Sequence, residues 1–184
     1  MATAATLAIT RPEPRTTASS WRVALAWIIC TGLPLGLFGL LNLGGEAIGI
    51  LPLFFAPFGL PGWVGAIAHL GQLALLGSAY WALTQRNTRS PARLWLIALM
   101  AGYVALPFIT PPLDSLQLSL VCTGLFLASV ATISRVGAVS PLAGWMMAPM
   151  LAVIGFSATM GLAIAAAYAP PFALMQAQQA PSAA

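Results

Sequence analysis

The stretch PFGLPGWVGAIAHLGQLALLGSAYWAL, residues 57–83, decides the fold of this chain. It begins with prolines and glycines, which favour a loop, and continues as an apolar run long enough to cross a bilayer as a helix. Early in that run lies His69, the single histidine of the sequence. An ionisable side chain inside a membrane helix is costly and usually faces a partner or a cavity. The stretch therefore predicts a membrane helix that carries a functional side chain.

The composition of the whole chain points to the same solvent. Of its 184 residues, 60% are hydrophobic and 5% are charged, whereas a soluble domain has about 25% charged residues. So few charges cannot cover a surface that faces water, and we expect membrane lipids to surround the protein. The formal net charge of +4 is small and dispersed along the chain, which argues against a nucleic-acid partner.

Hydropathy predicts an all-α integral membrane protein with a bundle of five transmembrane helices. A spanning helix needs about 20 apolar residues. Pro111 and Pro112 force the chain out of helix between the third and fourth of these segments. Residues 1–20 and 169–184 are small, polar and interrupted by proline, so we expect disordered tails. The predicted spans are residues 21–43, 62–84, 93–110, 113–134 and 141–168.

The segment between the first two spans, GGEAIGILPLFFAPFGLP (44–61), is apolar but broken by glycine and proline. Irregular backbone at membrane depth is tolerated only against protein or a cavity. We therefore interpret it as a folded lid over one end of the bundle. A loop at the membrane interface without a role in ligand binding is the alternative.

His69 and Gln72 are three residues apart, so they share one face of the second span. We expect both to face the interior below the lid, with Trp63 at the mouth of a pocket. The alternative is that a hydrogen bond to a neighbouring helix satisfies the imidazole. Because no second histidine or acid lies within the spans, we predict no metal site, and we expect Cys30 and Cys122 to pack as buried thiols.

The acidic residues are too few to suggest catalysis. Glu13 lies in the first tail, Glu46 in the lid and Asp114 at a turn, so no pair of carboxylates falls inside a span. General acid–base chemistry would have little to use. We therefore predict that the protein is not an enzyme.

Two motifs resemble those of the TspO/MBR family, the translocator or tryptophan-rich sensory proteins. In LPGWVGAIAHLGQL the family's Pro-x-Trp-Val pattern is present at Pro61, Trp63 and Val64. His69 stands where the family has a second tryptophan, and Leu73 stands where it has a tyrosine. The chain thus keeps the start of the family's second span and departs from its aromatic positions.

The fifth span, PLAGWMMAPMLAVIGFSATMG, keeps the family's residues at Ala143, Gly144, Pro149 and Leu151. Three pocket positions of the family differ, because Met150 replaces a tyrosine, Val153 a tryptophan and Gly161 an asparagine. The family resemblance covers about residues 25–168. It implies a five-helix bundle, often a dimer, whose pocket below the first loop binds porphyrins, sterol-like lipids and synthetic ligands. The predicted ligand-binding residues are Pro61, Trp63, His69, Gln72, Pro149, Met150 and Val153.

The leading hypothesis is therefore a TspO-like membrane protein that binds a bulky apolar ligand in an intramembrane pocket. The ligand would be a porphyrin, a sterol-like lipid or a pigment, and the role would be sensory, regulatory or transport. A tetrapyrrole is the one cofactor class that the resemblance implies. The alternative is a non-catalytic accessory subunit that packs against a larger membrane complex, a photosynthetic complex being one version.

The arginines predict the orientation. With five spans, all of them fall in or beside the segments on one side of the membrane, and Glu46 and Asp114 fall on the other. The positive-inside rule then gives a cytoplasmic N-terminus and a C-terminus on the opposite side. Reporter fusions after residues 88 and 180 should report opposite compartments. The same compartment for both fusions would contradict the five-span topology.

Overall fold

The chain forms five helices, and the computed structural model describes residues 20–56, 59–86 and 90–168. Every helix is long and apolar enough to cross a membrane, so this is a multi-pass integral membrane protein. The predicted all-α fold with five spans is confirmed, and no strand occurs within the described ranges. The helices are α1 (Ser20–Ala47), α2 (Gly62–Arg86), α3 (Ala92–Ile109), α4 (Ser115–Val139) and α5 (Pro141–Tyr168).

The ends of α1 and α4 differ from the predicted bounds. α1 continues to Ala47 instead of residue 43, because Gly44 and Gly45 stay helical. Gly49 ends the helix with a left-handed φ of 77°, and the Ile50 N–H donates to the Gly45 carbonyl at 2.8 Å. This is the glycine-based C-terminal motif of many helices. α4 continues to Val139 instead of residue 134.

The two predicted tails, residues 1–20 and 169–184, lie outside the described residues except for Ser20, which begins α1. The statements below concern the bundle between Ser20 and Tyr168.

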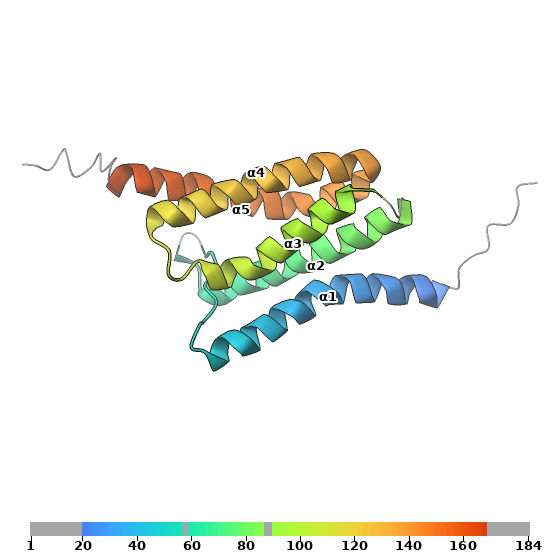
Figure 1. Cartoon of the computed structure of the whole chain (residues 1–184), viewed down its shortest axis with the longest axis horizontal. Coiled ribbons are helices and arrows are strands. Elements are labelled where there is room, and N and C mark those ends of the chain that lie inside the picture. The colour runs from blue at the N-terminus through green and yellow to red at the C-terminus, as the bar shows by residue number, and fades with distance from the viewer. Residues whose placement is uncertain (1–19, 57–58, 87–89, 169–184) are drawn as a thin grey trace, which may run out of the picture.

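The second helix is the centre of the bundle. It contacts every other helix, whereas α1 contacts only α2 and α3. Half of the residues in the most apolar 18-residue stretch of α2 are buried (50%), compared with 11% in the corresponding stretch of α1. In Figure 1, α4 and α5 lie together on one flank and α1 lies on the other, with α2 and α3 between them. Ser20 and Tyr168 lie at opposite ends of the bundle, as an odd number of spans requires.

α1 crosses α2 at a point fixed by small and polar residues. A methyl group at Gly77 would collide with the backbone of Cys30, so only glycine allows this close approach. One residue on, the Ser78 hydroxyl accepts a hydrogen bond from the Trp27 indole N–H at 3.2 Å and lies 3.1 Å from the Thr31 hydroxyl. Beyond the crossing, α1 diverges from α2 (Figure 1).

The end of α3 leaves one carbonyl available for another segment. In a helix the Pro107 carbonyl would accept from the N–H of residue 111, but Pro111 has none. The Leu53 N–H of the loop after α1 donates to it instead, at 2.8 Å. The predicted lid is therefore tied by its backbone to α3.

The described part of the lid also lies directly on α2. A methyl group at Gly65 would come within 2.5 Å of the Phe55 carbonyl oxygen and 3.1 Å of the Phe54 Cβ. The Phe54 ring packs against Phe38 of α1 and His69 of α2, with centroid separations of 6.0 and 5.7 Å. The Phe54 side chain thus packs between α1 and α2.

The bond between Leu53 and Pro107 predicts a hydrogen-exchange pattern. In lipid nanodiscs, the Leu53 amide should exchange slowly, because its N–H is bonded to the Pro107 carbonyl. Pro111→Ala supplies a competing N–H within α3, so exchange at Leu53 should accelerate. Pro112→Ala is the matched control, because the N–H that it adds would bond to a different carbonyl from that of Pro107. Equal exchange at Leu53 in the two variants would contradict this anchoring.

Candidate functional site

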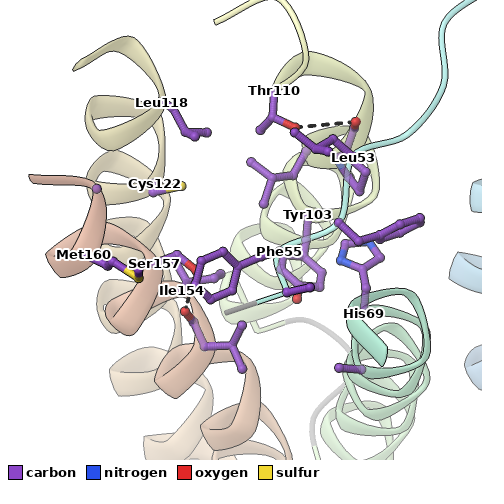
Figure 2. Close-up of a pocket in the computed structure, with 18 of the residues that line it drawn as sticks. Leu53, Phe55, His69, Tyr103, Thr110, Leu118, Cys122, Ile154, Ser157 and Met160 are labelled. Carbon is purple, nitrogen blue, oxygen red and sulfur yellow. Dashed lines mark hydrogen bonds between the residues drawn. The ribbon is translucent and has the colours of Figure 1, made fainter. Parts of the chain in front are cut away.

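A cavity of about 300 Å³ lies inside the bundle, below the loop that follows α1. Its wall comes from that loop and from α2, α3, α4 and α5, with no described residue of α1 (Figure 2). The described lining is Leu53, Phe54, Phe55, Ala56, Gly65, Ala68, His69, Gln72, Tyr103, Leu106, Pro107, Thr110, Leu118, Cys122, Val153, Ile154, Ser157, Met160, Gly161 and Ile164.

Polar groups on this wall concentrate where α2 faces α3. The Tyr103 ring of α3 stacks on the His69 ring, with a centroid separation of 4.4 Å and an interplanar angle of 25°. The Tyr103 hydroxyl donates a hydrogen bond to Oε1 of Gln72. That bond uses one lone pair of the amide oxygen, and Gln72, which lines the cavity, keeps its two amide N–H donors.

His69 is 6% exposed, and its buried Nε2 atom has no hydrogen-bond partner within the part of the chain that the structure describes. Aromatic rings surround the imidazole, and the Phe38 and Phe54 centroids lie 5.5 and 5.7 Å from it. A buried polar atom without a partner costs about 1–3 kcal/mol. The hydrogen bond to a neighbouring helix, which was the alternative expectation for this side chain, is not made by Nε2 in the structure.

The other polar side chains of the wall bond mainly to their own helices. The Ser157 hydroxyl donates to the Val153 carbonyl at 2.8 Å, and the Thr110 hydroxyl lies 3.5 Å from the Pro107 carbonyl (Figure 2). No Arg, Lys, Asp or Glu occurs in the described lining. The described residues also contain no group of three His, Cys, Asp or Glu side chains that could hold a metal ion. His69 and Gln72 are therefore the groups that can recognise a polar atom of a ligand.

Three of the seven predicted site residues line the cavity: His69, Gln72 and Val153. Trp63, expected at the pocket mouth, is instead 65% exposed. Six residues at about 100° each place it on a different face of α2 from His69. Pro61, just before α2, is also exposed and does not line the cavity.

The two predicted residues nearest the middle of α5 lie outside the wall as well. Met150 is 1% exposed and packs in the apolar core, and Pro149 faces outward. Both precede Val153 by about one turn, so they lie beyond the end of the cavity. The family resemblance predicted that Pro149 and Met150 line the pocket, and this prediction was wrong, because neither residue lines the cavity.

Sequence reasoning missed Tyr103, Cys122 and Ser157. Tyr103 is the only tyrosine within the predicted third span, and that isolated polar aromatic residue could have drawn attention to it. Cys122 was expected to be a buried thiol, and it is buried, but it also lines the cavity. Ser157 was not among the predicted site residues, although it lines the cavity.

Comparison of the chain with protein-family models, curated proteins and solved structures finds no match. The resemblance to the TspO/MBR family therefore stays a prediction. The geometry of the cavity is the basis on which a function can be proposed.

The geometry predicts opposite effects of two substitutions on stability. Tyr103→Phe leaves the Gln72 amide oxygen without its donor and should lower the free energy of unfolding by about 0.6–1.7 kcal/mol. His69→Phe removes a buried atom without a partner and should leave that free energy equal or higher. Denaturation by sodium dodecyl sulfate in mixed micelles measures both.

The double variant Gln72→Leu/Tyr103→Phe is the control for the first substitution. It removes both partners, so it should be less destabilised than the sum of the two single variants. If His69→Phe lowered the free energy of unfolding more than Tyr103→Phe does, the imidazole would have a structural role. That result would contradict its assignment as an unpartnered group of the cavity wall.

Proposed function

We propose that this protein binds one uncharged, largely apolar molecule in the cavity and acts as a receptor or carrier instead of an enzyme. The observation that supports this most is the buried Nε2 atom of His69, which has no hydrogen-bond partner among the described residues, in a wall without charged side chains in its described part. A buried nitrogen without a partner destabilises the folded protein, whereas a ligand that forms a hydrogen bond to it removes this free-energy cost.

The neighbouring donors specify the polar end of the ligand. Gln72 accepts a hydrogen bond from Tyr103 at its oxygen and keeps its N–H groups as donors. A neutral imidazole can donate from one nitrogen. A carbonyl or hydroxyl oxygen, which can accept hydrogen bonds, fits this pair of side chains. The rest of the ligand would contact the leucine, phenylalanine and methionine side chains of the wall.

The absence of charge in the described lining narrows the ligand classes. A porphyrin with carboxylate groups would bury negative charge without a described cation in the wall, which is unfavourable at low dielectric. A volume of about 300 Å³ also lies at the lower end of small-molecule sites. Among the ligands that the family resemblance implies, we therefore favour a sterol-like lipid or a pigment over a porphyrin.

The outward face of α1 favours a second candidate function, that of an accessory subunit in a larger membrane complex. Gly32, Gly36 and Gly39 share one face of α1, and no other group lies within 4 Å of a methyl group placed at any of them. A face of small residues lets another helix approach closely. This candidate does not explain the imidazole, so we give it second place.

Binding can be tested on the protein in lipid nanodiscs with three probes: dehydroergosterol, all-trans-retinal and protoporphyrin IX. Energy transfer from tryptophan to each probe measures occupancy. We expect saturable binding, at one molecule per chain, of at least one uncharged probe. His69→Phe should weaken it by about 2- to 12-fold, the equivalent of one hydrogen bond of about 0.5–1.5 kcal/mol.

Two substitutions on α5 separate cavity binding from partition into lipid. Ser157→Phe fills part of the cavity and should abolish the saturable signal. Thr159→Phe adds the same ring at an exposed position outside the lining and should leave the signal unchanged. Failure of both uncharged probes to bind, or preferential binding of protoporphyrin IX, would contradict the proposal.

A further inference from the structure

A second hollow of about 370 Å³ lies beside the cavity, at the seam between α2 and α5. We call it the outer hollow. No polar side chain occurs in its described lining, which consists of Phe55, Ala56, Leu60, Val64, Gly65, Ala68, Ala152, Val153 and Phe156. A wall of this composition suits an apolar chain and offers nothing to bind a hydrated ion.

The outer hollow and the cavity share one wall. Five residues line both: Phe55, Ala56, Gly65, Ala68 and Val153. Four of these are glycine, alanine or valine, so Phe55 is the only large side chain among the described residues that line both spaces. Figure 2 shows Phe55 extending from the loop toward Ile154 and Ser157 of α5. Its ring thus forms part of the wall between the two spaces.

Phe55 is held by weak contacts on its outer side. Its ring packs edge-on against Phe156 of α5, with a centroid separation of 6.1 Å and an interplanar angle of 63°. It is 40% exposed. A pair of this kind contributes about 0.5–1.5 kcal/mol beyond burial, so rotation of the Phe55 side chain is accessible at ordinary temperature.

The outer hollow lies beside the middle of α5 and the first two turns of α2. Ala152 and Phe156 lie near the middle of α5, about 17–23 Å from its start at Pro141. At the loop, by contrast, the backbone bond between Leu53 and Pro107 ties the chain to α3. A molecule that enters from the bilayer between α2 and α5 therefore meets only apolar side chains among the described residues. A molecule that enters past the loop meets the hydrogen bond between Leu53 and Pro107.

We propose that the ligand reaches the cavity sideways from the bilayer, between α2 and α5 and past Phe55. This inference extends the proposed function, because it makes the ligand a lipid-phase molecule with a slender apolar part. Its oxygen-bearing end lies at His69 and Gln72, and a longer molecule leaves its tail in the outer hollow.

The native thiol of Cys122 tests the route without any ligand, since it lines the cavity. In a Cys30→Ala protein in nanodiscs, N-phenylmaleimide dissolved in the lipid alkylates the remaining thiol, and mass spectrometry follows the rate. Ala152→Trp fills the outer hollow and should slow the reaction about tenfold, which corresponds to about 1.4 kcal/mol of barrier. Phe55→Ala removes the ring from this wall and should accelerate it.

Ala163→Trp is the matched control, because residue 163 lies three turns along the same face of α5 and lines neither space. It should leave the rate unchanged. Equal rates in Ala152→Trp and Ala163→Trp, or no alkylation even in Phe55→Ala, would overturn the proposed route.

The association rate of dehydroergosterol and all-trans-retinal in the same variants separates this inference from the proposed function. Saturable binding with slower association in Ala152→Trp supports both. If alkylation responds to Ala152→Trp but neither probe binds, the route stands and the ligand proposal fails. If a probe binds and its association rate is unchanged in Ala152→Trp, the ligand proposal stands and the proposed route is contradicted.

Discussion

The hydrogen bond from the Leu53 N–H to the Pro107 carbonyl determines the shape of the site. It exists because Pro111 cannot supply the helical donor, and inside a membrane a free carbonyl must find another. The bond holds the loop against α3, and Gly65 lets the same loop lie on α2. The cavity is the space that these two contacts leave between the loop and the inner faces of α2 to α5.

The five spans could be predicted from sequence because lipid demands long apolar segments whose backbone bonds internally. The inward placement of His69 and Gln72 followed from helical spacing and from the cost of polar groups in hydrocarbon. Tyr103 could not be assigned as their partner, because the rotation of α3 against α2 depends on packing across the whole bundle. Trp63 was expected at the pocket mouth because it lies near the lid, but its six-residue spacing from His69 puts it on a different face of α2.

The contact between α2 and α3 combines one satisfied and one unsatisfied polar group. Tyr103 and Gln72 complete each other, whereas the adjacent imidazole keeps Nε2 without a partner among aromatic rings. Proteins tolerate such local costs where function needs them, and other contacts offset them. In this bundle the offset comes from tight crossings such as that of α1 at Gly77.

The single residue between α4 and α5 has a consequence for how the bundle assembles. Ser140 alone separates the two helices, so they can pair as a local hairpin with little loss of chain entropy. α1 is joined to α2 by a much longer connection and touches only α2 and α3. Biogenesis should therefore leave α1 and the loop to dock after the hairpin forms, and the site is completed only in that last folding step.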